Sequence, residues 1–548
     1  MDRDYFGKDY CTTKVFPKKI FVNQLGYKPD SVKRGVITRP CTDFALKNEK
    51  GEVVYSGKVA HFGVDAASQD DVYVADFSDF TASGRYTLSV DGEDSYAFEI
   101  GDSVYHQLSI DLLRAYYYLR CGEDLTEEHA GVYTHPACHV ALAKDWENPE
   151  TELDVRGGWH DAGDYGRYVT PGATAVAHLL FAYQLYPEKF DKLHLNIPES
   201  GNGTPDILNE CRVELEWMMK LQRPDGAVYH KATTQFHADF CMPQDDLNQL
   251  WLFPVSTIAT ADLAAICALA SRVYKPFDPV FSKILLTTAV KSAKWLEANP
   301  EFRFVHPQNH GTGSYGEHDD KDNRFWAWTE LYLSTGSDEY KAKMDASLAS
   351  FDERFPYIGM GYGFVSGMGP LSYILSGRED ELCEKYKASF LTEAENLTHI
   401  CDSCGWGAAM TEHSYGWGSN MGLGRNGMMF AIADYILKSD KYKAYAQKQL
   451  DFLLGMNATG YSWVTGEGEF SVNYPHLRPA HADGIEKCMP GYVSGGPNRH
   501  RQDHVARALI PEGTPPMKCF IDEVGTYSVN EITIYWNSPF VFLAGYLE

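Results

Sequence analysis

The hydrophobic periodicity of this chain changes near residue 100. Between Lys19 and Ile100, short runs rich in β-branched and aromatic residues alternate with turns, for example GEVVYSG, GRYTLSV and SYAFEI. Several strands at this spacing predict an all-β sandwich. From Val104 onward, long amphipathic stretches such as VYHQLSIDLLRAYYY and ATADLAAICALASRVY predict helices. We therefore expect a small β domain at residues 1–102 and a mainly α domain at residues 103–548, which agrees with the length of the chain.

The formal net charge of −26 and the pI near 5.1 limit the partners of the chain. Nucleic acids and anionic membranes would repel it, so we expect neither as a partner. No stretch approaches the roughly twenty apolar residues that span a bilayer. The first residues, MDRDYFGKDY, lack the apolar core of a signal peptide. We expect a monomer that acts on a neutral ligand, either secreted after removal of a signal or in the cytoplasm.

Two aspartates stand close together in the segment GGWHDAGDYGRYVT, residues 157–170. Asp161 and Asp164 are separated by two small residues, so a helical or turn-like backbone would aim both carboxylates in the same direction. Together they could hold one water molecule. The segment also carries aromatic side chains of the kind that stack on sugar rings, namely Trp159, Tyr165 and Tyr168. The alternative is that Asp161 caps a helix and Asp164 lies in its first turn.

Far downstream, Glu531 is the single acid in the apolar and aromatic run YSVNEITIYWNSPFVFLAGYL. Burial would raise the pKa of this carboxyl group and keep it protonated as a general acid near neutral pH. The alternative is a partly exposed glutamate at the start of a helix after Asn530. Two acids early in the chain and one late form a set that suits a glycosidase.

These segments resemble glycoside hydrolase family 9, the cellulase family that includes clostridial endoglucanase D. Further segments match in family order over nearly the whole chain: DILNECRVELEWMMKLQRPDGAVYHK from Asp206, FWAWTELYLSTGSDEY from Phe325, QLDFLLGMNATGYSWVTGEG from Gln449 and YPHLRP from Tyr474. Ala458 and Leu477 depart from the pattern, because the family commonly has proline and a second histidine there. The resemblance implies an (α/α)6 barrel of twelve helices, preceded by an immunoglobulin-like sandwich.

Two cysteines and two histidines together form a donor set of the kind that zinc prefers. The twelve cysteines are scattered, without the dense framework of a small disulfide-rich domain. Two thiols and two imidazoles nevertheless form a soft donor set, although not at zinc-finger spacing: Cys121, Cys138, His139 and His160. The resemblance implies a structural zinc at these positions. The alternatives are a Cys121–Cys138 disulfide, or free buried thiols beside surface histidines.

A second metal is expected in the acidic turn EHDDKDN. The turn offers hard oxygen donors and resembles a calcium loop of the family, which implies a structural calcium ion. The candidate ligands are Glu317, Asp319, Asp322 and Asn323. The alternative is a solvated charged loop without an ion.

The function we predict is inverting hydrolysis of β-1,4-glucosidic bonds in cellulose and related β-glucans, with endo action. Glu531 is the general acid, Asp164 is the general base, and Asp161 orients the attacking water, which needs about 6.5 to 9.5 Å between acid and base. His476, Arg478 and Tyr527 are expected to bind sugar hydroxyls. Candidate stacking platforms, each of which could equally belong to the core, are Trp406, Trp417 and Trp463.

Other readings of the same residues remain open. An exo-acting glycosidase on cello-oligosaccharides or β-linked glucosamine oligomers would use the same acids if a loop blocked one end of the cleft. The stretch from Cys488 to Cys519 is a candidate for such a loop. A non-catalytic carbohydrate-binding protein would keep the aromatic residues but would not need all three acids. The β domain is expected to be structural, with sugar binding as the lesser alternative.

Overall fold

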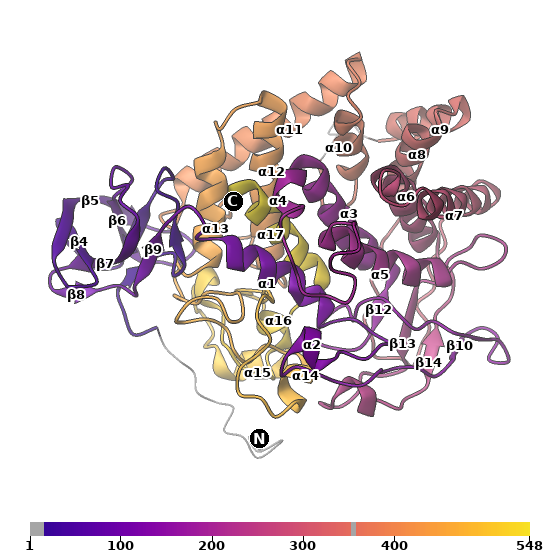
Figure 1. The fold of residues 1–548 in the computed structure, drawn as a ribbon, viewed down its shortest axis with the longest axis horizontal. Helices are drawn as coiled ribbons and strands as arrows, with labels where there is room; N and C mark the ends of the chain where they lie inside the picture. Colours follow the sequence, from indigo (N-terminus) through magenta and orange to yellow (C-terminus); the bar gives the residue numbers. More distant parts are fainter. Residues whose placement is uncertain (1–15, 352–357) are drawn as a thin grey trace. The chain divides into compact units, whose positions relative to one another are not determined.

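Residues 16–351 and 358–548 are described by the computed structural model, and they fall into two units (Figure 1). The first unit joins the chain up to Ala115 with Ala394–Glu548. The second unit is Tyr116–Glu393. Residues 1–15 of the predicted β domain lie outside the described residues.

The N-terminal part of the first unit is a β-sandwich, indigo in Figure 1, whose strand pairs are antiparallel except for the parallel pair β2–β9. One layer has the strand order β1-β3-β6-β5 and the other the order β5-β4-β7-β9-β2, with β8 paired to β7. The strand β5 belongs to both layers, because its residues 53–58 pair with β4 and its residues 59–64 pair with β6. The strands are β1 (Ile20–Phe21), β2 (Gly26–Tyr27), β3 (Arg34–Ile37), β4 (Asp43–Asn48), β5 (Val53–Val64), β6 (Asp71–Asp76), β7 (Gly84–Val90), β8 (Glu93–Asp94) and β9 (Phe98–Ile100).

Alternating side chains fill the core of the sandwich. Along β7, Tyr86, Leu88 and Val90 point inward, at the period of two that a strand with one buried face requires. Phe44 and Leu46 of β4 join the same hydrophobic cluster. The β-rich runs predicted between residues 19 and 100 are therefore confirmed.

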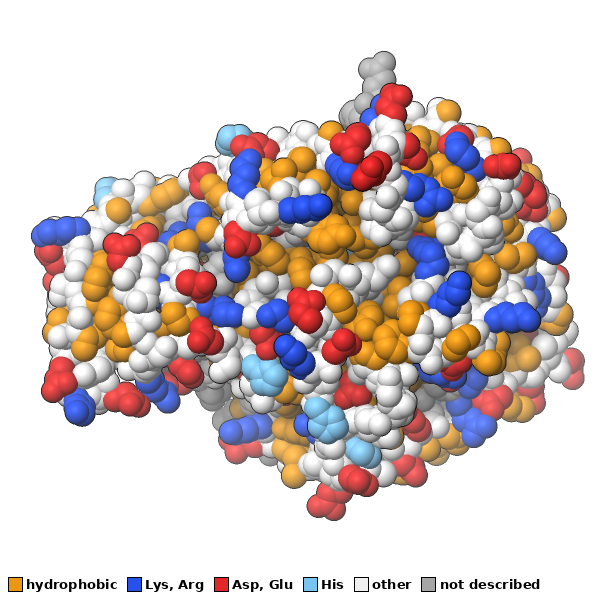
Figure 2. Space-filling view, turned by 45° about the horizontal axis from the view of Figure 1, so that its top comes forward, with side chains coloured by type: hydrophobic (Ala, Val, Ile, Leu, Met, Phe, Trp, Pro, Cys, Tyr) orange, Lys and Arg blue, Asp and Glu red, His pale blue; other side chains and the backbone are white. Residues whose placement is uncertain are grey.

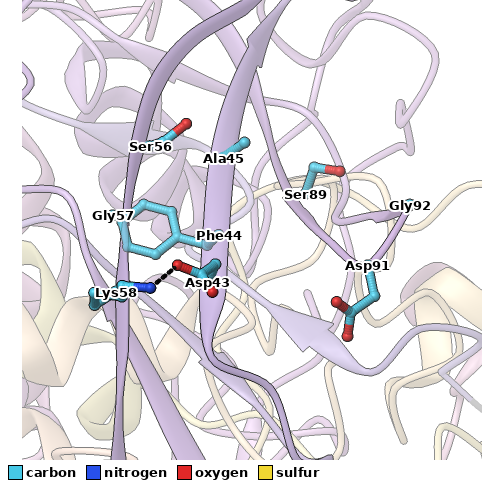
Figure 3. A pocket seen from close by; sticks show the side chains of 9 residues that line it. All are labelled: Asp43, Phe44, Ala45, Ser56, Gly57, Lys58, Ser89, Asp91 and Gly92. Carbon is cyan, nitrogen blue, oxygen red and sulfur yellow. Dashed lines mark hydrogen bonds and ion pairs between the residues drawn. The ribbon is translucent and has the colours of Figure 1, made fainter.

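A pocket of about 670 Å³ lies on the sandwich (Figure 3). Its lining comes from β4, β5 and the end of β7: Asp43, Phe44, Ala45, Ser56, Gly57, Lys58, Ser89, Asp91 and Gly92. Phe44 is the single aromatic residue among these nine, and it is only 3% exposed because it belongs to the core. These nine residues therefore offer no flat aromatic surface to a sugar ring. A structural role for the β domain stays a prediction.

Helices make up the rest of the first unit. The three helices α12, α13 and α17 pack on one another. Gly427 allows α12 to approach α17 closely, because a Cβ atom there would lie 2.7 Å from Leu543. The elements are α1 (His106–Tyr117), α11 (Glu381–Ser403), α12 (Ser419–Leu437), α13 (Lys443–Leu453), α14 (Arg478–Ala482), α15 (His504–Leu509), η2 (Pro516–Lys518), α16 (Tyr527–Asn530) and α17 (Ile534–Leu547); α1 and α11 each extend across the boundary between the units.

The sandwich and the helices of the first unit are joined by buried polar contacts. Asn23 Nδ2 donates to Asp451 Oδ1 at 2.9 Å, and Gln24 Nε2 donates to the carbonyl of Gly460 at 2.8 Å. Trp406 Nε1 donates to Ser68 Oγ at 2.9 Å. Buried polar groups are costly to leave unpaired, so these contacts fix the sandwich against the helical part.

The second unit is built around α6, which packs against α3, α7 and α8. Ser256 begins α6, because its side chain accepts a hydrogen bond from Ala259 N. The helices are α2 (Glu127–Ala130), α3 (Val169–Leu185), α4 (Pro187–Phe190), α5 (Asp206–Lys220), α6 (Thr257–Tyr274), α7 (Pro279–Ala298), α8 (Lys321–Thr335), α9 (Asp338–Ala349), α10 (Met368–Leu375) and the short η1 (Pro243–Asp245). A small sheet has the order β11-β10-β14-β13-β12: β10 (Ala143–Asp145), β11 (Glu152–Leu153), β12 (Arg167–Tyr168), β13 (Lys231–Thr234) and β14 (Leu250–Leu252).

By length and composition, α6 is the one described helix apolar enough to cross a membrane. The sequence analysis did not expect a helix of this kind. Of the 18 residues of α6, 94% are buried inside the protein, as in the core helix of a globular domain.

The charged side chains are mixed on the face shown in Figure 2. Acidic and basic side chains are interspersed there, so the net negative charge is not gathered into one acidic patch on that face.

Candidate active site

A short antiparallel pairing positions the aspartate segment in the second unit. His160 N donates to Leu119 O at 2.7 Å, and Cys121 N donates to Gly158 O at 2.9 Å. The turn before this pairing needs glycine, because Gly158 has φ +75° and a Cβ atom there would lie 2.7 Å from the Trp217 ring. The segment that ends at Asp161 is therefore held along residues 119–121.

Two glutamates of α5 hold Trp159 from both ends. Glu214 accepts a hydrogen bond from Trp159 N at 2.7 Å, and Glu210 accepts one from the indole Nε1 at 2.8 Å. Glu210 is also paired with the buried guanidinium of Arg120 at 2.7 Å. Because Trp159 precedes His160 and Asp161 directly, this clamp fixes the backbone from which both side chains extend. The sequence analysis did not identify the two glutamates.

Asp161 is buried and hydrogen-bonded. Its amide donates to Gly166 O at 2.9 Å, which closes a turn around Asp164, and its Oδ2 accepts a hydrogen bond from the Tyr315 hydroxyl. Burial raises the pKa of Asp161 well above its usual range; the Tyr315 hydrogen bond opposes this rise, and the charge of Asp164 adds to it. The helix-capping alternative is wrong, because α3 begins only at Val169 and its N-cap residue is Tyr168.

Asp164 has a different environment. Its Oδ1 accepts a hydrogen bond from Gly166 N at 2.5 Å, and its Oδ2 lies 3.2 Å from Nδ1 of His237. The buried ammonium of Lys231 interacts with the same carboxylate through its charge; burial lowers the pKa of Lys231 to about 7, and Asp164 opposes that shift. Sequence reasoning missed His237 and Lys231, since both follow more than sixty residues later and no motif marks them.

Glu531 lies in the first unit, at the end of α16. Its carbonyl accepts a hydrogen bond from Gly495 N at 2.8 Å, and its backbone forms a parallel bridge with His476. Asn530 fixes this arrangement, because its Nδ2 donates to Tyr474 O at 2.8 Å and its Oδ1 accepts from Ser494. Glu531 does not start a helix, since it follows α16 and the next helix begins at Ile534. It is half-buried, however, and not buried as the sequence predicts.

Aromatic and imidazole rings of the first unit gather near Glu531. The ring of Tyr527 lies 5.6 Å from that of His476 and 5.5 Å from that of Trp417. Trp417 is 45% exposed, as a sugar platform requires. Arg478, the first residue of α14, is mostly buried. The structure therefore brings together His476, Tyr527 and Trp417 among the predicted substrate contacts.

The assignment of Trp406 and Trp463 as stacking platforms needs correction. Both indole rings are completely buried. Trp406 packs on Phe21 of the sandwich with ring centroids 5.0 Å apart, and Trp463 packs on Phe452 and Phe520. A ring that is covered on both sides by other residues has no face for a sugar, so these two tryptophans belong to the core.

The four predicted zinc ligands form one cluster in the second unit. Their donor atoms all lie within 4.8 Å of one another, and all four residues are buried: Cys121, Cys138, His139 and His160. The Sγ atoms of Cys121 and Cys138 are 3.9 Å apart, near the roughly 3.8 Å edge of a tetrahedral site with Zn–S bonds of about 2.3 Å. A disulfide needs about 2.05 Å, so that alternative is wrong, as is the one with surface histidines.

The remaining geometry of the cluster also fits a metal ion. His139 Nδ1 lies 3.8 Å from Cys121 Sγ, and His160 Nε2 lies 3.9 Å from Cys138 Sγ. The far nitrogen of His139 lies 3.3 Å from Asp246 Oδ2, which is the usual carboxylate partner of a ligating imidazole. Asp246 was not identified from the sequence. These donors can hold one tetrahedral ion.

The predicted calcium ligands do not converge to the same degree. Asn323 Nδ2 donates to Glu317 Oε1 at 3.3 Å and to Asp262 Oδ1 at 3.0 Å. Asp322 accepts a hydrogen bond from Val365 N instead, and Asp319 accepts one from Lys321 N. Among the described residues, the cysteine–histidine cluster has its donor atoms close enough together to hold one metal ion, and the side chains of this loop do not.

Comparison with known proteins identifies the family. Residues 105–544 match glycosyl hydrolase family 9, and residues 16–95 match the cellulase N-terminal ig-like domain. The chain belongs to glycosyl hydrolase family 9. A relative, a cellodextrinase from Butyrivibrio fibrisolvens, is 43% identical over 97% of this chain and 100% of its own length.

Solved structures of family 9 enzymes match the whole fold. A single mutant of a thermostable endoglucanase from Alicyclobacillus acidocaldarius has a TM-score of 0.90 at 35% identity and covers 97% of this chain and 99% of that one. A Zn-binding triple mutant of the family 9 endoglucanase J30 has a TM-score of 0.89 at 32% identity, with 95% and 99% covered. These matches confirm the (α/α)6 barrel preceded by an immunoglobulin-like sandwich.

Membership of family 9 also decides the class of reaction. The chain is a glycoside hydrolase of the cellulase type, and it hydrolyses β-1,4-glucosidic bonds of β-glucans. The prediction of a non-catalytic carbohydrate-binding protein is therefore set aside.

Proposed function

We propose that this family 9 enzyme is an inverting endo-β-1,4-glucanase in which Asp164 is the general base. The observation that carries the proposal is the contrast between the two aspartates. Asp161 is buried, and its surroundings favour the protonated form, whereas Asp164 interacts with the positive charge of the buried Lys231 and has the His237 imidazole 3.2 Å from its Oδ2. A base must be ionised before it accepts a proton, so Asp164 is the better candidate.

The proposed reaction is a single displacement. Glu531 donates a proton to the glycosidic oxygen, and the bond from that oxygen to the anomeric carbon breaks. A water molecule attacks the anomeric carbon from the opposite face, and its proton passes to Asp164. Asp161, held by Tyr315, accepts the other hydrogen of this water and so orients it. The product is the α-anomer, and His476, Arg478, Tyr527 and Trp417 bind the glucan.

We propose a structural zinc ion for the cysteine–histidine cluster. Zinc would be held by the two thiolates of Cys121 and Cys138 and by the imidazoles of His139 and His160. With four protein ligands it has no open position for a substrate, so its role is to crosslink the segments that carry them. The J30 triple mutant supports the choice of zinc, because that related protein is described as Zn-binding. Calcium at Glu317, Asp319, Asp322 and Asn323 remains our second metal proposal.

A specific observation supports exo action on cello-oligosaccharides as a second candidate. The relative from Butyrivibrio fibrisolvens is named a cellodextrinase, and this chain covers its whole length. The stretch from Cys488 to Cys519 is anchored within its unit, since Met517 N donates to Ala67 O at 3.1 Å and Asn498 N to Cys519 O at 2.9 Å. A loop that is fixed in this way could block one end of the substrate cleft, as exo action requires.

The remaining proposals concern the molecule as a whole. We propose that the enzyme is a monomer with domains at residues 1–102 and 103–548. Its partner is β-glucan and not nucleic acid or a membrane. It is a secreted protein, with the cytoplasm as the alternative location. Gel filtration coupled to light scattering tests the monomer.

Two measurements on the purified enzyme test the mode of action. Proton NMR during the first turnovers on cellohexaose should show the α-anomer first, and an initial β-anomer would contradict inversion. Viscosity of carboxymethyl-cellulose should fall much faster than reducing ends appear if the enzyme acts inside chains. A constant viscosity, with release of glucose or cellobiose from cellohexaose, would favour the exo candidate.

A further inference from the structure

We propose that Asn530 is a positioning residue for the general acid, an inference that rests on the proposed role of Glu531. Asn530 directly precedes Glu531 and is completely buried. Its carbonyl accepts a hydrogen bond from His476 N at 2.9 Å, and the carbonyl of Glu531 accepts one from Gly495 N at 2.8 Å. The backbone that carries the acid is therefore bonded to the segment of His476 on one side and to the segment of Gly495 on the other.

The side chain of Asn530 reaches both of these flanking segments. Its Oδ1 accepts a hydrogen bond from Ser494 Oγ at 2.9 Å on one flank. Its Nδ2 donates to Tyr474 O at 2.8 Å on the other flank, and also to Asp522 Oδ1 at 3.0 Å. These bonds use the oxygen of the amide and both of its hydrogens. One side chain thus ties the segment of Glu531 to three other segments of the first unit.

The partners of this amide are themselves held by other hydrogen bonds. Asp522 accepts hydrogen bonds from Tyr474 N and Asn473 N, each at 2.9 Å. Ser494 N donates to a backbone carbonyl at 2.9 Å, and its own carbonyl accepts from Asn420 Nδ2 at 2.9 Å. Because both flanks are anchored in this way, they give Asn530 fixed points and do not simply move with it.

The position of this backbone matters because Glu531 must place its proton on the glycosidic oxygen. Loss of the amide would leave the segment to its backbone bonds and would take one partner each from Ser494, Tyr474 and Asp522. Buried polar groups that lose a partner are costly, so the surroundings would rearrange. A reacting group that is misplaced by about 1 Å can lose about 100-fold in rate. The expected consequence is slower proton donation.

The experiment compares a substrate that needs this proton with one that does not. Cellohexaose has a poor leaving group, whereas the dinitrophenyl group of an aryl cellobioside leaves without protonation. The ratio of the two kcat/KM values does not depend on the fraction of folded enzyme or on sugar contacts that both substrates make. We expect Asn530→Ala to lower kcat/KM by about 10- to 100-fold on cellohexaose and by less than about threefold on dinitrophenyl cellobioside.

A milder variant keeps the test decisive if Asn530→Ala does not fold. Ser494→Ala removes one of the three bonds and leaves the amide of Asn530 in place. It should fold and should shift the ratio in the same direction by roughly threefold. Melting temperatures verify the folding of each variant. A wild-type ratio in a folded variant, or equal losses on both substrates, would overturn the proposal.

The matched control is another buried asparagine of the first unit. Asn457 is completely buried, and its Nδ2 donates to Phe452 O at 2.7 Å and to Tyr461 O at 2.8 Å. Asn457→Ala should lower the melting temperature and keep the wild-type ratio. If it shifts the ratio as much as Asn530→Ala does, the effect belongs to the loss of any buried amide, and the proposal fails.

Glu531→Gln, measured on the same two substrates, separates the proposal from the function on which it rests. If dinitrophenyl cellobioside does not restore the rate of Glu531→Gln, the role of Glu531 as the acid is wrong. If it does restore that rate while Asn530→Ala and Ser494→Ala keep the wild-type ratio, only the inference about Asn530 fails.

Discussion

At the scale of single residues, two aspartates of one turn show how surroundings divide roles between identical side chains. Asp161 and Asp164 are separated by two residues, yet one is sealed under Tyr315 and the other faces an exposed imidazole and a buried ammonium. Desolvation disfavours the charged form, and nearby cations favour it. The two side chains are therefore expected to differ in their response to substitution.

The first prediction concerns the acid and the base. Asp164→Asn and Glu531→Gln should each lower turnover by about 10²- to 10⁴-fold, the usual contribution of general acid–base groups. An aryl cellobioside, whose leaving group needs little protonation, should partly restore the rate of Glu531→Gln but not that of Asp164→Asn. Asp154→Asn, which alters an exposed aspartate paired with Arg156, is the control. If the aryl cellobioside restores the rate of Asp164→Asn and not that of Glu531→Gln, then Asp164 is the acid and Glu531 is the base.

The second prediction concerns the exposed tryptophan. Trp417→Ala should weaken hydrolysis of cellohexaose more than that of cellotriose, because a stacking platform serves only substrates long enough to reach it. The ratio of the two kcat/KM values is the measurement. Tyr435→Ala removes an aromatic ring of similar exposure from α12 and should leave the ratio unchanged. Equal losses on both substrates, with a lower melting temperature, would assign Trp417 to the fold instead.

At the scale of elements, the cysteine–histidine cluster brings together three segments that carry no regular secondary structure. Cys121 follows α1, Cys138 and His139 lie in the loop after α2, and His160 pairs with Leu119 directly before Asp161. His139 has φ +50°, an unusual backbone conformation for a residue with a Cβ atom, and such strain persists where the surroundings fix the backbone. Loss of the ion should therefore loosen the aspartate turn.

The third prediction follows from this arrangement. The purified enzyme should contain one zinc ion per chain, and a chelator should lower its melting temperature by several degrees, since an ion that binds only the folded state stabilises it. Cys121→Ser should lower both the zinc content and the melting temperature. Cys41→Ser, at a half-buried cysteine of the first unit, should keep the zinc. Absence of zinc together with an unchanged melting temperature in Cys121→Ser would refute the site.

At the scale of the whole molecule, buried carboxyl groups make stability depend on pH. Burial raises the pKa of Glu214 to about 8 and that of Asp262 to about 7. Glu467 reaches about 8 because of burial and of its hydrogen bond to Asp111. Exposed carboxyl groups of an unfolded chain titrate near pH 4. The folded state therefore binds more protons than the unfolded state between about pH 4 and pH 8. Through these groups the free energy of unfolding falls as pH rises through that window.

The fourth prediction isolates one of these groups. Glutamine at position 467 keeps a donor for Asp111 and cannot ionise, so Glu467→Gln should stabilise the protein relative to wild type, and the gain should grow as pH rises from 5 to 8. Melting temperatures at several pH values measure this. Glu486→Gln, at an exposed glutamate, should show no such trend. A gain that is independent of pH would show that Glu467 is not protonated in the folded state.

The sequence by itself determined the kinds of elements and the family. Strands and helices were readable because periods of two and 3.6 are local properties of the chain. The acids, the soft donor set and the family were readable because long motifs preserve residue types in order. Asp161, Asp164, Glu531 and the four predicted zinc ligands all come from such motifs, and their roles stay predictions.

Only the tertiary structure decided what covers or contacts each side chain. Trp406 and Trp417 look alike in the sequence, but Ser68 and Phe21 of the sandwich bury the first, while the second stays exposed. His237 reaches Asp164 because β13 pairs with β12 and brings the following loop beside the aspartate turn. Burial and contact depend on segments that lie tens to hundreds of residues apart, and no local pattern records which distant segment will pack against a given residue.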